Sequence, residues 1–62
     1  ALTSREEQVL HGICDGATNR DIAALLGLSE IAVKMHVRSL CSKLGAANRT
    51  QAAIIDMGVG LV

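Results

Sequence analysis

The sequence has no aromatic residue and no proline among its 62 residues. A core must therefore be built from Leu, Ile, Val, Ala and Met, which suits small, closely packed helices. Without Phe, Tyr or Trp the chain cannot stack bases on aromatic rings, and this disfavours RRM and OB modules for single-stranded nucleic acids. A chain of this length forms one domain at most and buries only about 60% of the surface of its unfolded form.

Cysteine is scarce, and long apolar runs are missing. Cys14 and Cys41 are too few for a disulfide framework, and both lie in expected helices, so we interpret them as small buried hydrophobic residues in a reducing compartment. No run approaches the roughly 18 apolar residues that cross a bilayer, and no signal peptide is evident. We expect a cytoplasmic protein with no membrane partner. The chain starts at Ala1 rather than Met, which favours a domain of a longer polypeptide, although processing can also remove an initial Met.

The formal net charge is zero, which alone disfavours a nucleic-acid partner. The charges are unevenly distributed, however. Residues 1–30 carry two arginines against five acids, a local charge of −3. Residues 31–55 contain no acid and four cations, namely Lys34, Arg38, Lys43 and Arg49. A basic half joined to an acidic half keeps a basic face while the total charge stays low.

Capping residues and glycines divide the chain into four segments. Thr3 and Glu6 match a capping box. Further N-cap candidates are Thr18, Ser29 and Asn48, and the glycines that can end helices are Gly16, Gly27, Gly45 and Gly58. The pattern predicts helices over about residues 4–15, 19–26, 30–44 and 49–58. The predicted fold class is all-α, a compact four-helix domain with a central helix-turn-helix.

Apolar residues recur at helical spacing in the first, second and fourth segments. The apolar positions are Val9, Leu10, Ile13 and Cys14 in the first, Ile22, Ala23, Leu25 and Leu26 on the expected apolar face of the second, and Ala52, Ala53, Ile54, Ile55 and Met57 in the fourth. The fourth set is apolar on more than one face.

The segment 30–44 separates into two faces at 100° per residue. Val33, Val37, Leu40 and Leu44 fall within about 60° of one another and form an inward stripe. On the other side lie Ile31, Met35, Arg38 and Ser42, with Lys34 on the flank. A long cationic outer face on the second of two helices joined by a tight turn is typical of a DNA recognition helix.

Two pairs on this helix have alternative interpretations. Lys34 and Arg38 are four residues apart and project from neighbouring turns, where both can pair with guanine, although two exposed cations can also be mere solvated charge. Ile31 and Met35 can meet thymine methyl groups in the groove. They can equally belong to the core if the helix is rotated by about 40° from this assignment, or contact a neighbouring protein.

Several stretches at fixed spacing resemble the LuxR-type helix-turn-helix of the FixJ, NarL and GerE relatives. They are Leu2–Glu6, Gly16–Ala23, Leu28–Glu30, Val33–Val37, Lys43–Gly45 and Asn48–Ala53. The resemblance covers nearly all of residues 1–62. It implies the DNA-binding output domain of a bacterial transcription regulator, usually placed after a receiver or ligand-binding sensor domain. Double-stranded DNA is then the partner.

The resemblance also assigns roles to individual residues. It implies base contacts from Lys34, Met35 and Arg38. It implies phosphate contacts from Thr18, Asn19, Ser29, Ser39, Lys43, Asn48, Arg49 and Thr50. It implies a homodimer on DNA through the fourth helix, with Ile54, Ile55 and Met57 in the interface. The family pattern usually has Thr where this chain has Ala32, so one hydroxyl contact to phosphate is expected to be absent.

The apolar fourth helix leaves a second hypothesis open, a helical protein-interaction or dimerisation module that does not bind DNA. The sequence shows no pattern typical of an enzyme, since it contains neither a Ser-His-Asp arrangement nor a glycine-rich phosphate loop. His11 and Cys14 are three residues apart, but a tetrahedral zinc site needs two more ligands. We expect no enzyme activity, no metal and no cofactor.

Overall fold

The computed structural model describes residues 2–57, apart from the side chain of Met57. It contains four helices, α1 (Ser4–Cys14), α2 (Asn19–Leu26), α3 (Glu30–Leu44) and α4 (Arg49–Met57), and no strand within the described residues. The predicted all-α, four-helix class is confirmed. The first helix ends one residue earlier than predicted, because Asp15 is already its C-cap. The predicted end of the fourth helix at residue 58 lies outside the described residues.

Each helix begins at a predicted N-cap side chain. The cap accepts a hydrogen bond from the backbone N–H three residues later, at 3.2 Å for Thr3, 3.1 Å for Thr18, 3.1 Å for Ser29 and 2.9 Å for Asn48. These bonds satisfy backbone donors that lack a partner within the helix. At α1 and α2 the bond is reciprocated by the acid at the third position, Glu6 or Asp21, which completes a capping box.

Glycines end the two helices of the helix-turn-helix. Gly27 after α2 has φ 69° and Gly45 after α3 has φ 71°, the left-handed region that residues with a Cβ rarely adopt. The residue after each glycine then donates its N–H back into the helix, Leu28 to the Ala23 carbonyl at 2.9 Å and Ala46 to the Cys41 carbonyl at 2.8 Å. The chain therefore turns sharply at both ends of α3.

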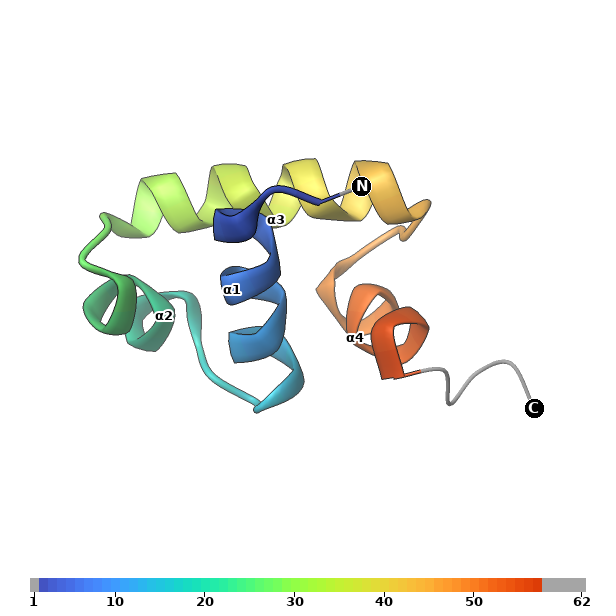
Figure 1. The fold of residues 1–62 in the computed structure, drawn as a ribbon. Helices are drawn as coiled ribbons and strands as arrows, with labels where there is room; N and C mark the ends of the chain where they lie inside the picture. Colours follow the sequence, from blue (N-terminus) through green and yellow to red (C-terminus); the bar gives the residue numbers. More distant parts are fainter. Residues whose placement is uncertain (1, 58–62) are drawn as a thin grey trace.

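Helix α3 is the longest, and the other three helices lie along one side of it (Figure 1). It contacts α1, α2 and α4, and α1 also contacts α4. In Figure 1 α2 lies near the start of α3, α1 near its middle and α4 near its end. One face of α3 is thus buried along most of its length, and its opposite face is left open.

The core takes residues from every helix. Its buried hydrophobic members are Val9, Leu10, Ile13, Ile22, Ala23, Val33, Leu40, Cys41 and Ala52. The largest side chains with almost no exposure are Ile22, Leu40, Val9 and Val33. The predicted inward stripe of α3 is confirmed, with Val37 and Leu44 partly buried at its edges.

Leu25 contradicts the predicted inward face of α2. Its side chain is 81% exposed, whereas Ile22 and Ala23 are buried and Leu26 packs against the core. A two-turn helix has only one inward direction. Leu25 lies about 100° away from the direction that the other three share, so it faces water.

The cysteines differ from each other. Cys41 is buried, as predicted, but Cys14 is only half-buried, and both are free thiols. Cys14 ends α1 beside α4, where its Sγ donates to Asp56 Oδ2 at 3.5 Å. Burial, followed by this carboxylate, raises the pKa of the Cys14 thiol. The prediction of a buried Cys14 is therefore wrong, because the last turn of α1 reaches the edge of the core.

Helices α1 and α2 meet at a position that needs glycine. A Cβ on Gly12 would lie 2.7 Å from Ile22 Cγ1 and 3.0 Å from Ile22 Cδ1. Ile22 is 1% exposed and has little room to move. The missing side chain of Gly12 leaves room for the Ile22 side chain to pack against α1.

Candidate nucleic-acid interface

The outer face of α3 carries the residues that were assigned to the groove. Ile31 is 72% exposed and Met35 is 67% exposed, and Lys34 and Arg38 are exposed beside them. On the inner face Val33 and Leu40 have no exposed surface. The predicted rotation of the helix is therefore confirmed. The alternative that Ile31 and Met35 belong to the core is excluded.

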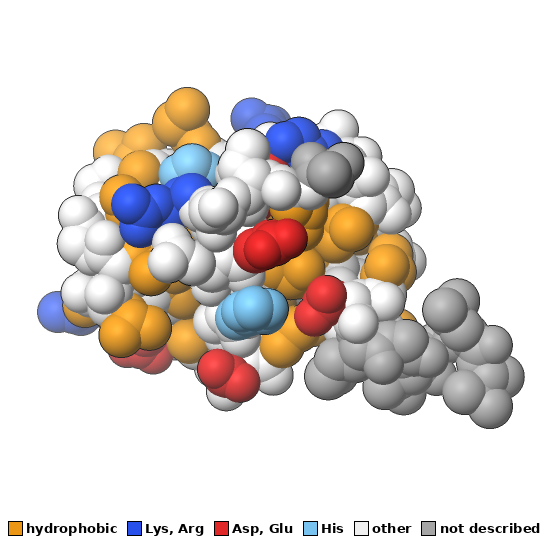
Figure 2. All heavy atoms as spheres, viewed as in Figure 1, with side chains coloured by type: hydrophobic (Ala, Val, Ile, Leu, Met, Phe, Trp, Pro, Cys, Tyr) orange, Lys and Arg blue, Asp and Glu red, His pale blue; other side chains and the backbone are white. Residues whose placement is uncertain are grey.

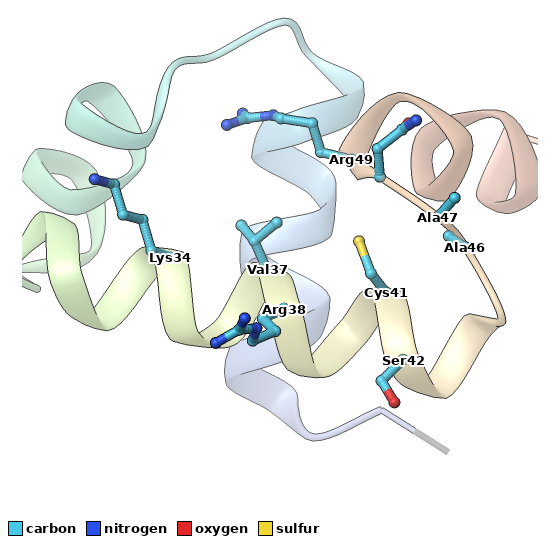
Figure 3. Close-up of a pocket in the computed structure, with 9 residues that line it drawn as sticks. Lys34, Val37, Arg38, Cys41, Ser42, Ala46, Ala47 and Arg49 are labelled. Carbon is cyan, nitrogen blue, oxygen red and sulfur yellow. The ribbon is translucent and has the colours of Figure 1, made fainter.

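An open hollow of about 390 Å³ lies between α3 and the start of α4 (Figure 3). Lys34 and Arg38 project from neighbouring turns of α3 at one side, and Arg49 lies at the other. Asn48, directly before Arg49 in the sequence, also lines the hollow. The remaining lining residues are Val37, Cys41, Ser42, Ala46 and Ala47. The lining thus contains three cations and no acid, which favours an anionic partner.

The charges on the surface show the same separation. On the face drawn in Figure 2, most Lys and Arg side chains lie toward the upper part, where α3 runs in Figure 1, and most of the visible acidic side chains lie below them. The zero net charge of the chain therefore hides a basic region around α3.

Arg49 connects α4 to the start of α2. Its NH1 group donates to Asn19 Oδ1 at 2.5 Å and its NH2 group donates to the Ala17 carbonyl at 2.8 Å. In Figure 3 the side chain extends toward the connection between α1 and α2. The structure thus brings together Arg49 and Asn19, two predicted phosphate contacts. A guanidinium has five N–H donors, so Arg49 retains donors for a phosphate oxygen.

Sequence reasoning missed the role of Glu6. Its side chain is 3% exposed. Besides the Thr3 backbone N–H at 2.8 Å, its carboxylate accepts from Ser39 Oγ at 2.5 Å and from Lys43 Nζ at 2.7 Å. The Lys43 ammonium, then the Ser39 hydroxyl and the Thr3 N–H, hold the pKa of Glu6 at about 2, below its ordinary 4.5, although burial acts in the opposite direction.

A signal for this role was present in the sequence. Glu6 shares the i, i+3, i+4, i+7 spacing of Val9, Leu10 and Ile13 and therefore faces the core. Ser39 and Lys43 had been assigned to phosphates by resemblance, and their polar groups are here bonded to Glu6. Lys43 keeps 40% of its side chain exposed. Its contact with phosphate stays a prediction.

The other predicted phosphate contacts lie at helix starts. Thr18, Ser29 and Asn48 are exposed N-caps, and Thr50 is exposed in the first turn of α4. The first N–H groups of a helix and its positive dipole end favour an anion. Ala32 lies in the corresponding turn of α3 and has no hydroxyl to add there.

The residues assigned to a dimer interface lie on α4. Ile54 and Ile55 are each 38% exposed. Met57 is the last residue of α4, but its side chain lies outside the described residues. Helix α4 therefore presents some apolar surface to solvent.

Two further findings concern other kinds of site. Within residues 2–57, no three His, Cys, Asp or Glu side chains gather closely enough to hold a metal ion. None of the helices described here combines the length and the apolar character needed to cross a bilayer.

Helices α2 and α3, the Gly27 turn between them and the basic outer face of α3 define a helix-turn-helix domain of the DNA-binding kind. Comparison with known proteins identifies the family. The GerE family model, described as bacterial regulatory proteins of the luxR family, matches residues 1–55. The chain therefore belongs to the LuxR family of bacterial regulatory proteins, as a DNA-binding domain of its transcription regulators.

Individual relatives agree with this result. The chain is 53% identical over 60 residues to the uncharacterized transcriptional regulatory protein YhcZ of Bacillus subtilis (strain 168), an alignment of 97% of this chain and 28% of that protein. It is 44% identical over 54 residues to the nitrate/nitrite response regulator protein NarP of Escherichia coli (strain K12), which covers 87% of this chain and 25% of NarP.

A solved structure has the same fold. The response regulator ChrA of a heme-sensing two-component system matches with a TM-score of 0.88 and 40% sequence identity, over 100% of this chain and 31% of that chain. The chain thus spans between a quarter and a third of the length of these relatives.

Proposed function

We propose that this domain binds double-stranded DNA in a sequence-specific manner, with α3 in the major groove. The observation that carries the proposal is the outer face of α3, where Lys34 and Arg38 are exposed on a helix whose opposite face packs against the core. Lys34, Met35 and Arg38 contact base edges. Arg38 and Lys34 pair with guanine, which offers two acceptors in the major groove.

Contacts to phosphate fix the register of α3 on the duplex. Asn48 and Arg49 flank the hollow opposite the two base-reading cations, so a strand that follows the groove edge meets both sets. Thr18, Asn19, Ser29 and Thr50 extend this line along the starts of α2, α3 and α4. Ser39 and Lys43 join it only to the extent that their bonds to Glu6 leave donors available.

The domain acts as a homodimer on two half-sites, with Ile54, Ile55 and Met57 of α4 in the interface. Ile54 and Ile55 support this role, because 38% of each residue is exposed and can be covered by a second copy. We place residues 1–62 at the C-terminal end of a longer cytoplasmic regulator, after a receiver or ligand-binding sensor domain. Two relatives named as response regulators are three to four times as long as this chain, which supports an additional domain.

Gel retardation on random duplex at low salt, followed by in-vitro selection of bound sequences, tests the proposal. Arg38→Ala is expected to weaken binding by about 1–3 kcal/mol and to relax the base preference at one position of the selected site. Arg5→Ala removes one cation of α1 outside the hollow and is the matched control, expected to keep the base preference. A domain that retards no duplex at any salt concentration would instead be a protein-interaction module.

A further inference from the structure

Two large apolar side chains lie in water on the outer face of α3. Ile31 and Met35 are 72% and 67% exposed, and a separation of four residues places them on neighbouring turns of the same side. Lys34 and Arg38 complete the i, i+3, i+4, i+7 pattern that starts at Ile31. The four side chains therefore form one stripe, in which apolar and cationic groups alternate.

The major groove matches such a stripe. Guanine offers acceptors to Lys and Arg, and thymine presents its C5-methyl group to apolar side chains. A protein partner fits less well, because a stable interface needs about 800 Å² on each side. Two side chains separated by cations are far too small an apolar surface for that. The alternating cationic and apolar side chains of the stripe thus match the acceptors and methyl groups of the major groove, and the small apolar area suits a groove better than a protein interface.

We propose that Ile31 and Met35 together read thymine methyl groups, so that the bound site carries thymines beside the guanines contacted by Lys34 and Arg38. The inference rests on the proposed function and adds Ile31 as a specificity-determining residue. Four residues advance α3 by about 6 Å, against about 3.4 Å between successive bases of a strand. The two thymines therefore lie about two base steps apart.

Replacing thymine by uracil tests the inference directly, because uracil pairs identically and lacks only the C5-methyl group. A duplex selected in vitro with this chain is synthesised with thymine, with uracil throughout, and with uracil at one position at a time. Affinity is measured by fluorescence anisotropy of the labelled duplex. Each contacted methyl group is expected to contribute about fourfold, so uracil throughout weakens binding about 15-fold.

Protein variants then assign the methyl groups. Ile31→Ala is expected to abolish the thymine–uracil difference at one position, and Met35→Ala at another about two steps away. Leu25→Ala is the matched control, because Leu25 is an 81% exposed apolar residue on α2 and its loss should leave both differences unchanged. Since all three side chains are exposed, thermal unfolding followed by circular dichroism should show the same midpoint for each variant.

Two results would overturn the inference. One is equal affinity of the unmodified domain for thymine and uracil duplexes, and the other is a Leu25→Ala variant that loses the difference as Ile31→Ala does. Failure to bind the thymine duplex at low salt is a different result, which contradicts the proposed DNA binding itself.

Discussion

The pair formed by Glu6 and Lys43 sets how strongly DNA binding should depend on salt. A protein that neutralises Z phosphates shows a slope of about −0.9Z in log K against log salt. Lys34, Arg38 and Arg49 line the hollow and have no acidic partner within 4 Å among the described residues. Lys43 is 2.7 Å from Glu6 Oε1 and is therefore already neutralised. Three effective cations predict a slope of about −2.7 for one domain on one half-site.

Glu6→Gln should make this slope steeper, although the substitution removes a buried acid of α1 that does not line the hollow. The amide oxygen can still accept from the Thr3 N–H, so the start of α1 is kept, while Lys43 loses its counter-charge and becomes available to a phosphate. The expected slope is about −3.6. The assay is anisotropy titration of a half-site duplex at salt concentrations between about 50 and 200 mM.

Glu7→Gln provides the control for this experiment. Glu7 is the exposed neighbour of Glu6 and has no side-chain hydrogen bond or ion pair among the described residues, so its loss changes the net charge equally but should leave the slope at the parent value. An unchanged slope in Glu6→Gln would refute the reasoning. Equal steepening in both variants would also refute it, because the effect would then be one of overall charge.

Three further expectations concern stability and assembly. The pKa of Glu6 is about 2 in the folded domain and near 4.5 in the unfolded chain. The ionised carboxylate therefore contributes its full stabilisation above pH 4.5, and this contribution is lost as the pH falls toward 2. Across this pH window the thermal midpoint should fall less steeply in Glu6→Gln than in the parent domain. Gly12→Ala should lower the free energy of unfolding by about 1 kcal/mol, since the clash of the new Cβ with Ile22 exceeds the gain in helix propensity. Thermal unfolding followed by circular dichroism should then show a midpoint about 4–8 °C lower. Ile55→Asp should abolish cooperative binding to a duplex with two half-sites and spare binding to one half-site, and an unaltered cooperativity would place the dimer contact elsewhere.

Local chemistry made the helices predictable from the sequence. Thr3, Thr18, Ser29 and Asn48 each act on a backbone N–H three residues away, and such short-range bonds do not depend on the rest of the fold. The inward stripe of α3 was predictable for a similar reason, because a long helix with four aligned apolar residues has only one side that can face a core.

The contacts that the sequence did not reveal are those between distant residues. Glu6 meets Ser39 and Lys43 across separations of 33 and 37 residues. Its match to a capping box had already explained its presence, and its position on the inward face of α1 did not say which distant residues it would meet. The bond from Arg49 to Asn19 spans 30 residues and depends on how α4 packs. Leu25 was misassigned because the four apolar residues of this eight-residue helix cannot all face the one direction that packs against the core.

The guanidinium of Arg49 connects the start of α4 to the start of α2. Arg49 is the first residue of α4, the helix proposed to form the dimer interface. Its side chain donates hydrogen bonds to the Asn19 side chain and to the Ala17 carbonyl, at and just before the first residue of α2. Pulling α4 away from the body would break both bonds and release the loop that the arginine keeps in place. If α4 pairs two copies of the domain and the start of α2 contacts phosphate, as proposed, the two roles depend on each other through this one side chain.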